Sequence, residues 1–166
     1  ASGRIRRRTG RGGDEGRVVT IGVPIKDAAL RAELEALIAE HAYRLDMNCS
    51  ENLAELYTED GSLIAPNFAC EGPEAINGYG RDRAAAKTRR VRHVCTNFRF
   101  WEDGPDQARG LCFILLFRSN GPELSPAEPI ALADAHDIYR RGPDRIWRIQ
   151  ERRIVLSFES AAHKSS

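Results

Sequence analysis

The chain has 166 residues, of which 42% are hydrophobic and 30% are charged. This composition is typical of one globular domain with a hydrophobic core. No apolar run is long enough to span a membrane, and no apolar segment follows the basic N-terminus as it would in a signal peptide. We therefore expect a soluble, cytoplasmic protein.

Positive charge is concentrated at the N-terminus. Residues 1–17 contain six arginines and two acidic residues, a net charge of +4, so the rest of the chain carries −3 of the total +1. An Arg/Gly-rich segment of this kind is typical of a flexible arm. We assign residues 1–23 to such an arm, 24–158 to a single domain and 159–166 to a flexible tail. The arm has no aromatic side chains to stack on bases, and we expect neither a nucleic-acid nor a membrane partner.

The four cysteines show no pairing rhythm. They have no CxxC spacing, which argues against a zinc site and against a disulfide framework, and favours reduced thiols. They are Cys49, Cys70, Cys95 and Cys112.

Residues 26–48 are predicted to form a long helix. Asp27 is a favourable N-cap, and His41 falls within the apolar stripe. Asp46 lies in the last turn, where the helix dipole disfavours a carboxylate, and Tyr43 points away from the stripe. The leucines and isoleucine at helical spacing are Leu30, Leu34, Leu37, Ile38 and Leu45.

Two shorter helices and a short strand are predicted next. Residues 50–61 are expected to form a helix capped by Ser50, and residues 62–66 a strand. Residues 72–87 are predicted to be a helix with Pro73 at its first position.

The second half of the chain has the pattern of β structure. Strands are predicted over residues 91–101, 107–118, 130–140 and 145–158, separated by turns and one Pro-rich loop. Helices followed by a meander of strands indicate an α+β domain. We expect the helices to cover one face of a curved antiparallel sheet.

The stretch "RRVRHVCTNFRF" places polar side chains inside a predicted strand. Because side chains alternate along a strand, His93, Cys95 and Asn97 would share one face, either towards solvent or towards a polar pocket. The residues expected on the opposite face are Val94, Thr96, Phe98 and Phe100.

Other polar residues are open to several interpretations. From spacing alone, Asp46 is either a surface acid or a partner for His93, and His41 is either a core histidine or a pocket residue. His136 shares a strand face with Asp134. A metal site built from His93, His136 and an aspartate is conceivable, but no spacing selects it, and we predict no metal.

Three segments together resemble a known family. They are "IAEHAYRLDMNCSENLAELYTEDGSLIAPNFACEGPEAINGY", "RHVCTNFRF" and "DRIWRIQERRIV". In order and spacing they resemble the SnoaL-like branch of the nuclear-transport-factor-2-like superfamily, which includes scytalone dehydratase, bile-acid 7α-dehydratase and hexachlorocyclohexane dehydrochlorinase. The resemblance covers about residues 27–157. It implies a cone-shaped fold, in which a strongly curved sheet wraps around a long N-terminal helix with a pocket between them.

The resemblance also implies site residues. It carries over an Asp–His dyad onto Asp46 and His93, with the histidine as the base and the aspartate orienting it. Relatives have a tyrosine or another polar residue where this chain has His41, which is expected to assist the leaving group. We predict that the substrate is contacted by Asn97, Tyr43, His136 and Arg153. Asn97 and Arg153 also have structural interpretations, as an amide joining strands and as a partner for surface acids.

The implied activity is that of a cofactor-independent lyase or isomerase. Its substrate would be a hydrophobic, hydroxylated ring compound, steroid-like or polyketide-like, and dehydration is the preferred reaction. The alternatives are a non-catalytic small-molecule-binding or assembly protein of the same fold, or the small subunit of a ring-hydroxylating dioxygenase. Relatives imply a homodimer or homotrimer.

Overall fold

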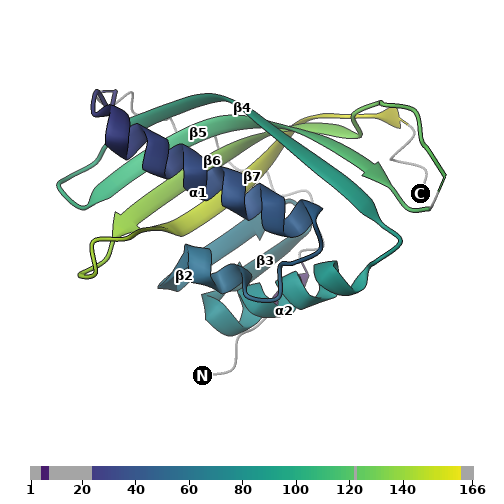
Figure 1. Ribbon diagram of the computed structural model, residues 1–166, viewed down its shortest axis with the longest axis horizontal. Helices are drawn as coiled ribbons and strands as arrows, with labels where there is room; N and C mark the ends of the chain where they lie inside the picture. Colours follow the sequence, from purple (N-terminus) through teal and green to yellow (C-terminus); the bar gives the residue numbers. More distant parts are fainter. Residues whose placement is uncertain (1–4, 8–23, 122, 162–166) are drawn as a thin grey trace.

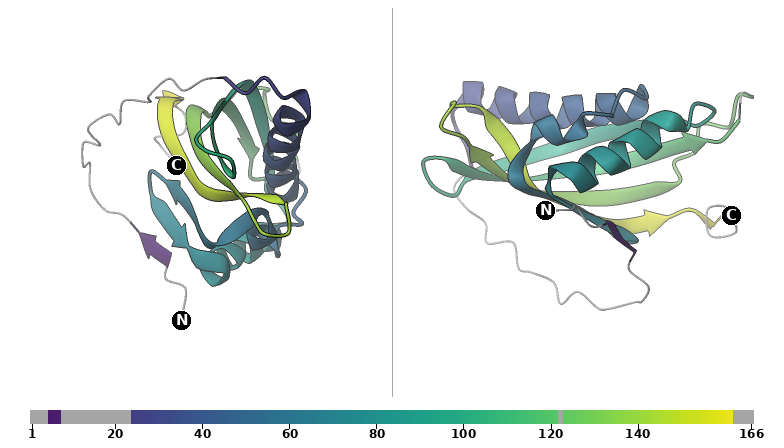
Figure 2. Two further views of the ribbon diagram at one scale, coloured as in Figure 1. Left: turned by 90° about the vertical axis from the view of Figure 1, so that its left-hand side faces the viewer. Right: turned by 90° about the horizontal axis from the view of Figure 1, so that it is seen from below.

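The structure is a computed structural model that describes residues 5–7, 24–121 and 123–161. This part of the chain forms two α-helices, one 3-10 helix and a seven-stranded sheet with strand order β1-β3-β2-β7-β6-β5-β4. The sheet is strongly curved, and the long helix α1 lies across it (Figures 1 and 2). The predicted α+β class and the curved sheet around a long helix are confirmed.

Helix α1 (Ala28–Asp46) forms where the apolar spacing predicts it. The Asp27 side chain caps it by accepting hydrogen bonds from the backbone N–H groups of Ala29 and Leu30, at 2.9 and 3.3 Å. Its buried side chains recur every three or four residues, so one stripe packs on the sheet. These side chains are Leu34, Ile38, His41, Ala42 and Leu45.

The predicted helix over residues 50–61 is wrong in most of its length. Only Leu53–Leu56 are helical, as the 3-10 helix η1, and β2 (Tyr57–Ala65) begins at the next residue. Ser50 does not act as the predicted cap, because its Oγ donates a hydrogen bond of 2.8 Å to the carbonyl of Gly80. This hydrogen bond joins the segment that follows α1 to the helix α2, which contains Gly80.

After β2 the structure has the predicted helix, preceded by a short strand that was not predicted. A short strand β3 (Phe68–Glu71) pairs with β2, and helix α2 (Gly72–Ala85) follows directly. Pro73 lies in the first turn of α2, where its missing N–H costs no hydrogen bond.

Four long strands complete the sheet. They pair as an antiparallel meander and are β4 (Arg90–Glu102), β5 (Gln107–Ser119), β6 (Ala131–Arg141) and β7 (Trp147–Glu159). One pairing differs from the antiparallel sheet that was predicted from the sequence. Strand β2 pairs with β7 in parallel. The chain can make this parallel pairing because α2 and the other three long strands lie between β2 and β7 in sequence.

The N-terminal arm is described only in part. The strand β1 (Ile5–Arg7) pairs with β3, and Pro24 forms an isolated bridge with Trp101. The rest of the predicted flexible arm, up to residue 23, and residues 162–166 of the predicted tail lie outside the described residues.

Irregularities in the strands decide which side chains face inward. The pairing register shifts between Thr96 and Arg99 in β4, and between Ile138 and Tyr139 in β6, where the partner strand β7 contributes an extra residue. Each such bulge moves the alternation of side chains by one position and bends the strand. These shifts determine which of the predicted polar residues reach the interior.

Candidate active site

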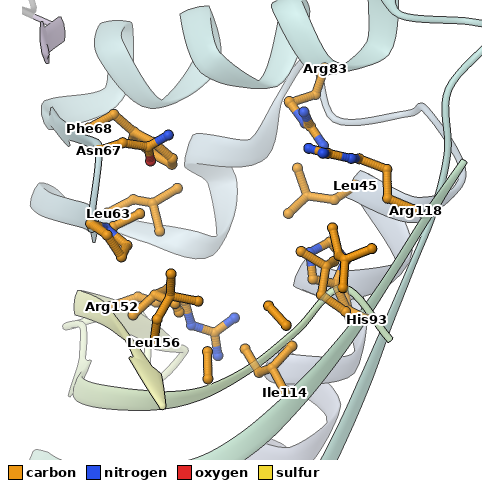
Figure 3. A pocket seen from close by; sticks show the side chains of 18 of the residues that line it. Leu45, Leu63, Asn67, Phe68, Arg83, His93, Ile114, Arg118, Arg152 and Leu156 are labelled. Carbon is orange, nitrogen blue, oxygen red and sulfur yellow. The ribbon is translucent and has the colours of Figure 1, made fainter. Parts of the chain in front are cut away.

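A cavity of about 600 Å³ lies between α1, α2 and the inner face of the sheet. Figure 3 shows it with side chains projecting into it from several elements. Its wall along β6 is made of small side chains, Ala131 and Ala133, which leave space that larger residues would fill. The apolar part of the wall includes Leu45, Leu63 and Ile114.

Asp46 and His93 meet at this cavity. Oδ1 of Asp46, the last residue of α1, lies 2.5 Å from Nδ1 of His93 in β4. The other carboxylate oxygen accepts a hydrogen bond of 2.8 Å from the backbone N–H of His93. Both side chains are largely buried, with exposed fractions of 10% for Asp46 and 18% for His93. Two hydrogen bonds therefore fix the carboxylate against the histidine.

This geometry determines how the imidazole is presented. An ionised carboxylate only accepts hydrogen bonds, so Nδ1 of His93 carries the proton and Nε2 carries the lone pair of the neutral ring. Within the described chain, Nε2 has no protein partner, and His93 lines the cavity. The arrangement suits a base whose far nitrogen is held by an acid.

His41 lies deeper in the same cavity. It is 5% exposed, and its Nε2 is 2.8 Å from the hydroxyl of Tyr57. Burial, with added repulsion from Arg152 and His93, holds the pKa of His41 well below its usual value. His41 is therefore neutral at physiological pH and acts there as a hydrogen-bonding group.

A buried ion pair forms the floor of the site. Arg152 of β7 donates from Nε and Nη2 to the two carboxylate oxygens of Asp137, at 2.9 and 2.8 Å, and Tyr139 donates to the same carboxylate at 2.7 Å. Burial opposes the charge on Arg152, but the Asp137 carboxylate keeps the pKa of this guanidinium well above its usual value. Arg152 also lines the cavity, across from His93 in Figure 3, and its Nη1 has no protein partner within the described chain.

Two residues predicted to bind substrate lie away from the cavity lining. Tyr43 is 56% exposed, because it lies on the side of α1 that does not pack on the sheet. Asn97 is exposed as well and does not share the face of His93. It lies in the bulge of β4 with a φ of 57°, and there the alternation shifts, so that Phe98 and Phe100 pack into the core.

The other two predicted substrate contacts face the outside of the sheet. His136 and Arg153 are directly paired across β6 and β7, on the side opposite the cavity. Arg153 forms an ion pair of 3.3 Å with Glu151. At this point of β7, the side chain that faces the cavity is that of the neighbouring residue Arg152, which was not predicted from the sequence. The signal available for Arg152 was an oppositely charged residue, Asp137, among the alternating alanines of the preceding strand.

The described residues were also considered as metal ligands and as reactive thiols. Among the described residues, no three His, Cys, Asp or Glu side chains cluster closely enough to hold a metal ion. His93 and His136 are on opposite faces of the sheet, so they do not form the site considered from the sequence. All four cysteines are free thiols, and Cys95 lines the cavity.

In the part of the chain that the structure describes, no helix has the length and apolar character needed to cross a membrane.

Comparison with known proteins defines the family. Residues 26–153 match the SnoaL-like domain, and the chain belongs to this family, which includes polyketide cyclases and dehydratases. No curated protein gives a significant match.

Solved structures share the fold. An NTF2-like protein with a cystatin-like fold from Novosphingobium aromaticivorans is 26% identical, with a TM-score of 0.65 over 81% of this chain and 86% of that one. A proposed scytalone dehydratase from the same organism is 22% identical, with a TM-score of 0.68 over 80% and 87% of the two chains. ActVI-ORFA from Streptomyces coelicolor is 19% identical, with a TM-score of 0.68 over 78% and 98%.

Proposed function

We propose that the protein is a cofactor-independent lyase or isomerase that removes a proton from a hydrophobic, hydroxylated ring substrate. The observation that carries the proposal is the 2.5 Å contact between Asp46 and Nδ1 of His93, beside a largely apolar cavity of about 600 Å³. A histidine held in this way is a suitable general base near neutral pH. Dehydration is the preferred reaction.

The dehydration would begin at a carbon next to a ring carbonyl. Nε2 of His93 takes the proton, and the electron pair of the broken C–H bond moves towards the carbonyl to give an enolate. The C–O bond of the β-hydroxyl then breaks, a C=C bond forms, and the departing hydroxide takes up a proton to leave as water. Asp46 stabilises the imidazolium that exists between these events.

Two further groups fit the charges that develop. Arg152, a buried cation that lines the cavity, is suited to hydrogen-bond the enolate oxygen through Nη1. His41, joined to the Tyr57 hydroxyl at 2.8 Å, is suited to hydrogen-bond the departing oxygen. Because His41 is neutral, the proton for the hydroxide would come from the imidazolium of His93, which returns His93 to its neutral form.

A direct test uses 3-hydroxy-1-tetralone as a minimal probe. Loss of water from this compound gives 1-naphthol, whose appearance is followed by absorbance and mass spectrometry. We expect turnover by the wild type and a loss of about 10²–10⁴-fold in the His93→Gln variant, the range typical of a general base. Val94→Ala is the matched control, since Val94 is the next residue of β4 and is 48% exposed on the outer face. Undiminished turnover in His93→Gln would refute the proposal.

A further inference from the structure

Three arginines converge at one end of the cavity. Arg83 comes from the last turn of α2, Arg89 from the segment between α2 and β4, and Arg118 from the end of β5. Figure 3 shows the guanidinium groups of Arg83 and Arg118 approaching one another at this end of the cavity. All three side chains line the same space as His93.

The backbone directs these side chains inward. Arg118 is paired with Val91 across β4 and β5, and Val91 is only 5% exposed, so Arg118 is on the inner face of the sheet. The guanidinium carbon of Arg83 lies 5.9 Å from the centre of the Tyr79 ring, which covers part of its surface. The cluster is therefore part of the cavity wall and not of the outer surface.

Two donors of this cluster are buried without an acceptor. Nε of Arg83 and Nε of Arg89 are buried and have no hydrogen-bond partner within the described chain. A buried donor left without a partner is costly, more so on a charged group. Burial, together with repulsion from Arg83 and Arg118, lowers the pKa of Arg89 to about 10. The close approach of these positive charges is thus electrostatically unfavourable.

Acidic side chains are scarce among the residues that line the cavity. Glu159, at the end of β7, is the carboxylate among the lining residues, and it is exposed. It forms no ion pair with another side chain in the described chain. Asp137, further inside, is already paired with Arg152. The cavity wall that the structure describes therefore gives the buried Nε donors of Arg83 and Arg89 no carboxylate partner.

We propose that Arg83, Arg89 and Arg118 bind the anionic group of a ligand, a carboxylate or a phosphate, while its ring body lies against the apolar wall. Guanidinium groups match the planar donor geometry that such oxyanions require. Where this ligand is the substrate, the inference rests on the proposed function. The hydroxylated ring compound would then also carry a carboxylate or a phosphate, a group that the minimal probe 3-hydroxy-1-tetralone lacks.

Binding can be measured without turnover. Isothermal titration calorimetry would compare 2-naphthoate, 2-naphthyl phosphate and the neutral 2-naphthamide on the wild type. We expect at least about a tenfold preference for an anion over the amide, as charge-assisted hydrogen bonds imply. The anion that binds with the higher affinity shows whether the arginines are better suited to a carboxylate or to a phosphate.

Variants locate the binding site. Arg83→Gln and Arg89→Gln should each weaken anion binding about tenfold and leave amide binding unchanged, while folding is checked by thermal unfolding. Arg81→Gln is the matched control for Arg83→Gln. Arg81 lies on the same helix and is exposed, and its substitution removes the same charge. If Arg83→Gln does not fold, the Arg89→Gln variant alone decides.

The outcomes separate this inference from the proposed function. Equal binding of the anions and the amide, no binding of either anion, or equal losses in Arg81→Gln and the cluster variants would each overturn it. His93→Gln should keep the preference for the anion over the amide. A retained preference, together with undiminished turnover of 3-hydroxy-1-tetralone in His93→Gln, would refute the proposed function alone.

Discussion

Nδ1 of His93 lies 2.5 Å from Oδ1 of Asp46, although 47 positions separate the two residues in sequence. The contact joins the C-terminal end of α1 to the inner face of β4. An acid at a helix C-terminus is locally unfavourable, since the dipole there is negative. The histidine, which donates from both its backbone and its ring, gives the carboxylate two compensating hydrogen bonds.

The two residues are expected to act as one unit in turnover. Asp46→Asn should lower kcat/KM by about 10²–10³-fold, because an amide does not stabilise the imidazolium and can favour the wrong tautomer. The double variant Asp46→Asn with His93→Gln should then be no worse than His93→Gln alone, since residues of one unit are not additive. Steady-state kinetics on 3-hydroxy-1-tetralone would measure the three losses. Losses that multiply would mean that the two residues act independently.

The burial of His41 makes stability depend on pH. Its pKa is lower in the folded than in the unfolded state, where it is near 6.5, so the unfolded chain binds more protons as the pH falls below that value. Stability from this group is therefore fully present above about pH 6.5 and is lost below it, by at most about 1.4 kcal/mol per pH unit.

Urea unfolding at several pH values compares the wild type with His41→Gln. At pH 8 both side chains are neutral, so the difference there reports packing and the hydrogen bond to Tyr57 alone. Between pH 6.5 and 5 the wild type should lose more stability than the variant. Parallel curves over this range would contradict the assignment of a lowered pKa to His41.

The buried pair of Asp137 and Arg152 should show strong coupling. Arg152→Met leaves the Asp137 carboxylate buried and unpaired, and we expect it to lower the free energy of unfolding by about 3–5 kcal/mol. Asp137→Asn should lower the free energy of unfolding by a similar amount. The double variant should lower it by clearly less than the sum of the two single losses. The exposed pair of Asp60 and Arg140 is the control. There, Asp60→Asn should cost less than about 1 kcal/mol.

Chemical denaturation of these variants gives the coupling energy directly. Additive losses for Asp137→Asn and Arg152→Met would mean that the two charges do not depend on each other, despite their contacts of 2.8 and 2.9 Å.

Much of the fold could be predicted from the sequence. The apolar spacing in α1, the Asp27 cap and Pro73 in the first turn of α2 are local signals, and each appears in the structure as predicted. The helix predicted from Ser50 largely failed, because the Ser50 hydroxyl bonds to Gly80 and β2 starts at Tyr57. Such non-local partners leave no trace in a single segment of sequence.

The candidate site was less predictable, and two bulges explain part of the difference. Simple alternation from His93 places Asn97 inward, and alternation from Trp147 and Ile149 places Arg153 inward. A bulge at Asn97 and an extra residue near Gln150 shift each strand by one position. Phe98 and Arg152 therefore occupy the inner face. Sequence alternation does not reveal a bulge that is set by pairing with a neighbouring strand.

The protonation of the two ring nitrogens of His93 can be observed in its ¹⁵N NMR spectrum at neutral pH. We expect a protonated Nδ1 held by Asp46 and an unprotonated Nε2 facing the cavity, with this tautomer preference reduced in Asp46→Asn. A proton on Nε2 in the wild type, or a spectrum unchanged by Asp46→Asn, would show that the carboxylate does not orient His93 as a base.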